Sequence, residues 1–138
     1  MSSRINSGFV RNSDAFNMDD GDIILVDGAD VSSTSGRIDV WVFDGTSGDI
    51  GGATLHWVRG IITNTFWPLA EGAFFDALTT GGPTNEAVKG GNNITGYKIG
   101  TGSCVNIYFD AVTFKLKIQN KRGHAVEVYY DAMIIKPN

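Results

Sequence analysis

The stretch that decides the fold class is RIDVWVF, residues 37–43. Its aliphatic side chains occupy every second position and form one face: Ile38, Val40 and Val42. The opposite face carries Asp39, Trp41 and Phe43. A period of two residues is the pattern of a β-strand, and the aromatic second face is expected to meet something apolar.

Segments of similar composition surround this strand, at 22–26, 54–63, 105–109, 113–119, 125–130 and 132–136. In 113–119 the alternation places Phe114 inward and Lys117 outward, and the turn at 120–123 predicts a hairpin in which Lys117 faces Glu127. Segments 37–43 and 54–63 are also expected to pair. Seven or more short antiparallel strands with uneven glycine-rich loops predict an all-β fold, an antiparallel β-sandwich or jelly roll.

Two segments depart from the strand pattern. Residues 68–78 could form one short helix with Leu69 and Phe74 on the same face, although Gly72 weakens it. Residues 1–22 are polar, which predicts an N-terminal arm that docks on a neighbour or on its own core. A single β-sandwich domain then covers residues 23–138.

Composition limits the partners. The chain has 138 residues, 42% of them hydrophobic, 18 glycines and a formal net charge of −4, a balance that disfavours nucleic-acid phosphates. The N-terminus lacks the apolar region of a signal peptide, and no apolar run approaches the length that spans a bilayer. We therefore expect synthesis in the host cytoplasm, with neither nucleic acid nor membrane as a partner.

No pattern predicts catalysis, a metal or a cofactor. His56 and His124 lie in separate segments without a nucleophile pattern beside them, and the single cysteine, Cys104, precedes an apolar strand and is assigned to the core. The acidic residues between Asp19 and Asp30 do not match a calcium-binding loop, and the glycines match no phosphate-binding loop. An enzyme whose active residues match no common motif remains a third hypothesis for the function, ranked after two hypotheses of binding.

The C-terminal stretch VTFKLKIQNKRGHAVEVYYDAMII, residues 112–135, resembles accessory proteins of tailed-phage virions. The resemblance implies a jelly-roll protein that decorates the capsid or associates with the tail. It further implies a homo-oligomer, often a trimer, localised in the virion and bound to major capsid or tail proteins. The alternative is a carbohydrate-binding module or receptor-binding tail protein, in which exposed aromatic rings stack on sugars.

Candidate partner-binding residues come from the N-terminal segment, from two tryptophans and from the long glycine-rich loop at 79–93, because loops of that length often carry function. They are Phe9, Val10, Phe16, Trp57, Trp67, Pro83, Asn92 and Asn93. Trp41 is assigned to the core. The saccharide reading requires at least one solvent-facing ring among Trp57, Trp67, Tyr129 and Tyr130, flanked by Asp or Asn.

Overall fold

The computed structural model describes residues 8–48, 50–58, 61–67, 75–78, 105–110 and 113–136, with only the backbone described for 62–67 and 75–78. These residues contain no helix and form strands. The strands are β1 (Gly8–Met18), β2 (Ile23–Asp30), β3 (Ser35–Phe43), β4 (Ile50–Val58), β5 (Ile61–Trp67), β6 (Phe75–Leu78), β7 (Val105–Phe109), β8 (Lys115–Asn120) and β9 (Val126–Lys136). The described part of the chain offers no helix that is long and apolar enough to cross a bilayer.

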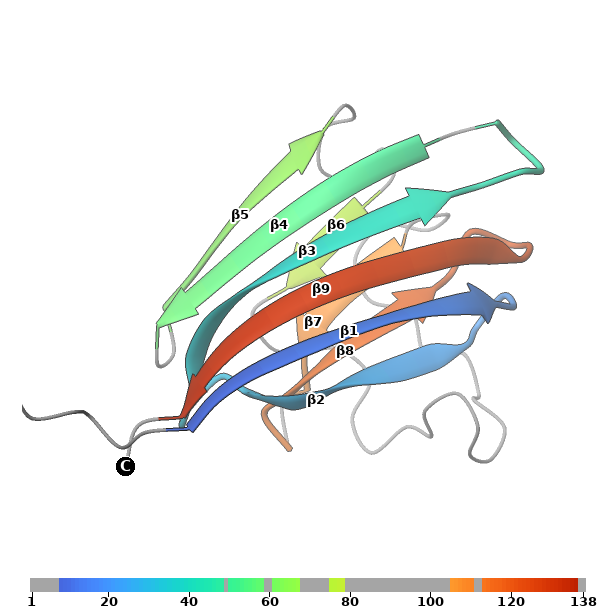
Figure 1. Cartoon of the computed structure of the whole chain (residues 1–138). Helices are drawn as coiled ribbons and strands as arrows, with labels where there is room; N and C mark the ends of the chain where they lie inside the picture. The colour runs from blue at the N-terminus through green and yellow to red at the C-terminus, as the bar shows by residue number, and fades with distance from the viewer. Residues whose placement is uncertain are drawn as a thin grey trace, which may run out of the picture.

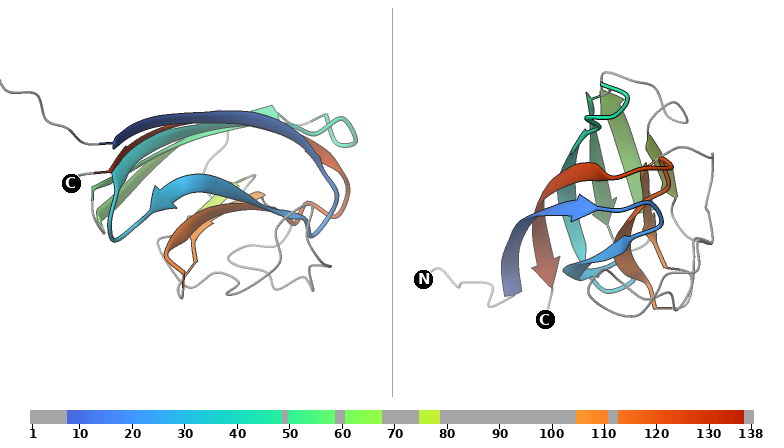
Figure 2. Two further views of the ribbon diagram at one scale, coloured as in Figure 1. Left: turned by 60° about the horizontal axis from the view of Figure 1, so that its bottom comes forward. Right: turned by 90° about the vertical axis from the view of Figure 1, so that its right-hand side faces the viewer.

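The strands form two layers, a β-sandwich, which confirms the predicted fold class (Figure 1). A five-stranded sheet has the order β1-β9-β3-β4-β5, and a four-stranded sheet has the order β2-β8-β7-β6. Neighbouring strands are antiparallel except β6 and β7, which are parallel. The five-stranded sheet arches over the smaller one, so its outer surface is convex (Figure 2).

The core lies between the sheets and follows the alternation read from the sequence. In β3, Ile38, Val40 and Val42 are buried, whereas Trp41 and Phe43 are exposed. Trp57 is 0% exposed and connects the layers: its ring meets the ring of Phe109 edge-on, with centroids 5.5 Å apart. Its indole N–H donates to Thr34 Oγ1 over 3.1 Å, so the one polar atom of the ring keeps a partner after burial.

The predicted hairpin between 113–119 and 125–130 is wrong. β8 pairs with β2 and β7, and β9 pairs with β1 and β3, so neither strand has a free edge for the other. The segment between them instead crosses from one sheet to the other. Lys117 therefore does not face Glu127; it is buried, and its Nζ donates to Asp110 Oδ2 over 2.8 Å.

Two smaller expectations are also corrected, and the N-terminal arm takes one of the two placements expected for it. The end of the proposed helix, Phe75–Leu78, is strand β6, while 68–74 lies outside the described residues. Much of the proposed arm is β1, which pairs with β9 over its whole length, so here the segment docks on its own domain. Phe114 precedes β8 at a positive φ of 63° and is exposed, because it belongs to the turn after β7.

Candidate functional site: the outer face of the five-stranded sheet

Large apolar side chains gather on one exposed surface. Among the described residues, ten large hydrophobic side chains are exposed, and all except Phe114 point outward from the five-stranded sheet. These nine are Phe9, Trp41, Phe43, Ile50, Val58, Ile61, Tyr129, Met133 and Ile135. We call this surface the outer face. Exposed apolar patches of this kind mark interaction sites more often than ordinary surface does.

Strand register divides the outer face into three zones. At one end lies the aliphatic patch. Its outermost row holds Phe9, Ile135, Val58 and Ile61, with Ser35 between Ile135 and Val58, and Met133 adds to it from the next row, where it lies between Arg11 and Arg37. In the middle lies the charged band, made of Arg11, Ser13, Asp131, Arg37, Asp39 and Thr54. Beyond it lies the aromatic row, in which the register aligns Ala15, Tyr129, Trp41 and Gly52 across four strands.

The charged band is held by hydrogen bonds between its own members. Arg11 donates hydrogen bonds to both carboxylate oxygens of Asp131, and its Nη2 lies 2.8 Å from Oδ2. Ser13 Oγ donates to Asp131 Oδ1 over 2.6 Å. These bonds from Arg11 and Ser13 hold the pKa of Asp131 below its usual value. The band is therefore polar but charge-matched, and its side chains have fixed orientations.

Arg37 and Asp39 repeat this arrangement one strand further on. Arg37 Nη2 lies 3.0 Å from Asp39 Oδ2, and Thr54 Oγ1 donates to Asp39 Oδ1 over 2.8 Å. Two arginines and two aspartates thus face solvent as two closed pairs. Pairs this exposed add little to folding stability, so their ordered geometry is better suited to orienting a partner.

The aromatic row holds two large rings between small residues. Trp41 is 44% exposed and Tyr129 is 39% exposed, and they are direct cross-strand neighbours. On the far side of Trp41 the register places Gly52, which has no side chain, and on the far side of Tyr129 it places Ala15. Both rings are consequently accessible from their flanks.

Phe43 and Glu127 stand beside this row. The ring of Phe43 meets that of Tyr129 at 88° with centroids 5.6 Å apart, and the Tyr129 hydroxyl donates to Glu127 Oε2 over 3.1 Å. The bond to Glu127, together with its negative charge, raises the pKa of Tyr129. The hydroxyl therefore stays protonated as a donor, and the rings of Tyr129 and Phe43 make a fixed corner.

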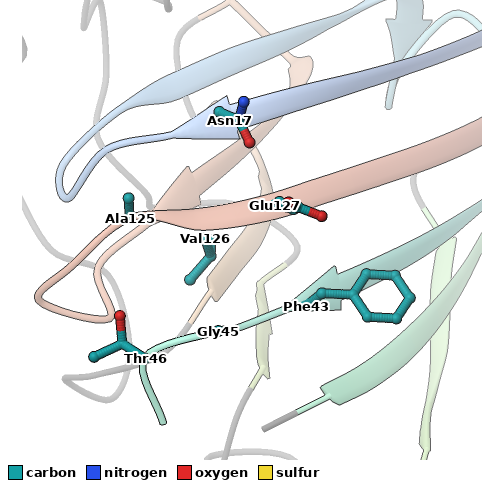
Figure 3. Close-up of a pocket in the computed structure, with 7 residues that line it drawn as sticks. All are labelled: Asn17, Phe43, Gly45, Thr46, Ala125, Val126 and Glu127. Atoms are coloured by element: carbon teal, nitrogen blue, oxygen red, sulfur yellow. The ribbon is translucent and has the colours of Figure 1, made fainter. Parts of the chain in front are cut away.

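Two hollows open next to this corner. One of about 350 Å³ is lined by Asn17, Phe43 and Glu127 together with the loop residues Gly45, Thr46 and Ala125, and by Val126 (Figure 3). Another of about 190 Å³ shares Asn17 and Glu127 and is also lined by Tyr129. Figure 3 shows Asn17, Glu127 and Phe43 coming from three neighbouring strands, β1, β9 and β3. Apolar walls with a few polar groups are typical of small-ligand sites.

The predicted site residues are only partly brought together. Phe9 is on the aliphatic patch, whereas Val10 and Phe16 point inward and pack against the core as partly buried side chains. Trp57 is fully buried, which removes it from the surface. The side chain of Trp67 and the residues Pro83, Asn92 and Asn93 lie outside the described part, although Trp67 pairs with Gly52 through its backbone.

Sequence reasoning placed Trp41 in the core, and that assignment is wrong. Trp41 belongs to the outward set of β3, together with Asp39 and Phe43. The alternation of β3 already carried this information. Of the tyrosines, Tyr130 is buried, and Tyr129 faces solvent with Asp131 and Glu127 two residues away on either side. The condition set for a saccharide site is met by Tyr129 alone among the named rings whose side chains are described.

One polar cluster lies at an end of the sandwich. Asp44 Oδ2 accepts a hydrogen bond from Arg122 Nε over 2.9 Å and lies 2.6 Å from His124 Nε2. Ser47 Oγ accepts from Arg122 Nη2 over 3.1 Å. These contacts make a clasp between the loops after β3 and β8, in which His124 is half-buried.

Comparison of the chain with protein-family models, with curated proteins and with solved structures finds no match. Within the described ranges no group of three or more His, Cys, Asp or Glu side chains is placed to hold a metal ion.

Proposed function

We propose that this chain is a non-enzymatic component of a phage virion, a capsid decoration protein that binds and stabilises neighbouring virion subunits. The observation that carries this proposal is the collection of nine large apolar side chains on the outer face. At about 200 Å² for a large side chain, their exposed fractions amount to on the order of 900 Å², of which the aliphatic patch holds on the order of 550 Å². The largest apolar patch on a typical monomer is about 300–600 Å² and is often functional, so the aliphatic patch alone lies at the upper end of that range.

The size of this surface fits stable association. A standard protein–protein interface buries about 800 Å² on each partner. The aliphatic patch would supply the apolar centre of such an interface, and the adjoining charged band would fix its orientation. A partner in a virion is either another copy of the chain or a capsid subunit, and the same patch serves both.

Because the outer face is convex, a partner with a concave surface fits it better than a second copy placed directly face to face (Figure 2). Two convex surfaces touch over a small area and leave the rest of the apolar side chains in water. A groove between capsid subunits would cover more of the patch. This supports contact of the aliphatic patch with a concave partner, which is either a groove between capsid subunits or a different surface of the next copy in a ring.

The first experiment is the solution mass of the purified chain, measured by size-exclusion chromatography with light scattering. We expect a homo-oligomer, with a trimer as the first expectation, that dissociates in the double variant Val58→Lys, Ile61→Glu. These two residues are direct cross-strand partners, so the introduced charges pair with each other and the hairpin is preserved. Phe114→Asn, which removes an exposed ring away from the outer face, is the matched control.

The virion setting has its own test. Mass spectrometry of gradient-purified particles of the phage that encodes the chain should detect it in fixed stoichiometry to the major capsid protein. Its absence from such particles would overturn the decoration role. A wild-type monomer whose mass and particle binding are unchanged by the double variant would overturn the assignment of the aliphatic patch.

A further inference from the structure

The aromatic row is separated from the aliphatic patch by the charged band, and its chemistry is different. Its two rings, Trp41 and Tyr129, are flanked within the row by Gly52 and Ala15, neither of which carries a large side chain. With neighbouring strands about 4.8 Å apart, four strands give the row a length of roughly 14 Å. This is a platform rather than a socket for a single inserted side chain.

The platform has hydrogen-bonding groups on both sides. On one side lie the carboxylates of Asp131 and Asp39, each held by an arginine and a hydroxyl group. On the other side lie Glu127 and Asn17, which line both hollows. An apolar strip bordered by fixed polar groups therefore matches a ligand with apolar faces and a polar rim.

Saccharides have this combination. A pyranose ring with equatorial hydroxyl groups presents C–H bonds above and below and hydroxyl groups around its edge. Its faces can stack on Trp41 and Tyr129 while its edge reaches the flanking carboxylates and amide. In such sites aromatic rings usually pack against an apolar face of the ligand, and polar groups fix its orientation.

Charge narrows the class of saccharide. The platform is bordered by three carboxylates, Asp39, Asp131 and Glu127, and the two arginines near it, Arg11 and Arg37, are already paired with the aspartates. An anionic sugar would meet the negative charge of Glu127 on one side and arginines already engaged by aspartates on the other, which costs affinity. An uncharged sugar does not incur this cost.

We propose that the aromatic row binds an uncharged oligosaccharide of pyranose rings with equatorial hydroxyl groups, stacked on Trp41 and Tyr129 with the Phe43 ring as the end wall. The site lies outside the aliphatic patch and does not depend on the virion setting. Glu127 orients Tyr129 through their hydrogen bond, and Glu127 and Asn17 face the end of the ligand that enters the hollows.

The test is isothermal titration of the purified chain with cellohexaose, laminarihexaose and chitohexaose in turn. The wild type should bind at least one of them, and Trp41→Ala should weaken that binding at least tenfold. Tyr129→Ala should weaken it as well, so that the result does not depend on one variant. Met133→Ala, which truncates an exposed side chain between Arg11 and Arg37 on the same face, should leave the affinity unchanged.

The outcomes separate this site from the proposed assembly surface. Val58→Lys, Ile61→Glu should alter the solution mass and leave saccharide affinity intact. The proposal is overturned if the folded wild type binds none of the three hexasaccharides, or if Trp41→Ala and Tyr129→Ala retain full affinity. It is equally overturned if these two variants change the solution mass and not saccharide binding, since the row would then be a protein contact.

Discussion

His124 Nε2 lies 2.6 Å from Asp44 Oδ2, and this contact joins the loop after β3 to the segment that crosses between the sheets. The same carboxylate accepts the backbone N–H groups of Thr46 and Ser47 and the guanidinium of Arg122. Burial on its own would raise the pKa of Asp44. The bonds from Ser47, His124 and Arg122 outweigh burial and hold that pKa far below its usual value.

The clasp around Asp44 should therefore make the free energy of unfolding depend on pH in the acid range. A carboxylate whose folded-state pKa is lowered stabilises the fold above its unfolded value of about 4, and that contribution is lost as pH falls toward the folded value. We expect Asp44→Asn to lower the unfolding free energy at pH 7 by about 3 kcal/mol, because Arg122 loses its buried partner. The gap to the wild type should narrow as the pH falls below about 4.

Urea unfolding at a series of pH values measures this effect. Asp19→Asn is the matched control, because Asp19 is exposed and contacts Asp22 through its backbone N–H and carbonyl oxygen. It should follow the wild-type curve. A constant gap between Asp44→Asn and the wild type from pH 7 to pH 2 would contradict the clasp.

Gly36 sets how closely β3 approaches the ring of Trp57. A Cβ built at Gly36 would collide with the Met133 carbonyl oxygen and lie 2.9 Å from the indole carbons of Trp57. Neither backbone nor a fully buried ring can move away easily. We expect Gly36→Ala to cost about 3 kcal/mol or more in the free energy of unfolding.

Gly45→Ala provides the comparison, because a Cβ at Gly45 meets nothing within 4 Å. Its effect should stay within about 0.5 kcal/mol. Denaturant unfolding monitored by tryptophan fluorescence would measure both variants. Equal stability of the two would mean that the close packing of β3 on Trp57 is not present in solution.

The ion pair of Lys117 with Asp110 should be strongly coupled. Their side chains are 6% and 0% exposed, and the Nζ–Oδ2 distance is 2.8 Å. Removing one charge leaves the other buried, so Lys117→Met alone should cost about 3–5 kcal/mol. Combining it with Asp110→Asn should cost clearly less than the sum of the two single changes.

The Arg37–Asp39 pair is the exposed counterpart for the same double-mutant cycle, with Arg37 at 52% exposure. Its coupling energy should be below about 1 kcal/mol, because water screens the charges. Coupling in the buried pair no larger than in this exposed pair would refute the interior placement of Lys117.

The sequence predicted the faces of strands better than their partners: the pairing of 37–43 with 54–63 is confirmed by β3 and β4, whereas the pairing of 113–119 with 125–130 is wrong. Alternation in 37–43 separated buried Ile38 from exposed Phe43, because side chains of a strand point to opposite faces whatever the strand pairs with. Partner choice depends on contacts distant along the chain, such as β1 with β9. The lone turn NKRG, residues 120–123, therefore looked like a hairpin although it joins different sheets.

The candidate site was partly predictable for the same reason. That Trp41 and Tyr129 point outward follows from alternation within their own strands. That they are cross-strand neighbours does not follow from alternation, because β3 and β9 are far apart along the chain and their register is known only from the structure. Lys117 was misplaced because an alternating pattern assigns charged residues to the surface, whereas a buried partner such as Asp110 can hold a lysine inside.

Asn120 ends β8 where the chain leaves the smaller sheet, and its side chain fixes that crossing. Its amide nitrogen donates to the carbonyl oxygens of Met18 and His124, and its Oδ1 accepts the N–H of Arg122. The residue is 0% exposed, so Asn120→Ala leaves three backbone groups without this partner in a site with little water. We expect a loss of about 2–4 kcal/mol in unfolding free energy, whereas Asn17→Ala, at an exposed position, should change it by less than about 0.5 kcal/mol.

Hydrogen exchange measures the same contact at the turn itself. The backbone N–H of Arg122 should exchange faster in Asn120→Ala than in the wild type, since it loses its acceptor. Wild-type protection of that N–H in the variant would mean that the turn is held by other contacts, as a local hairpin would be.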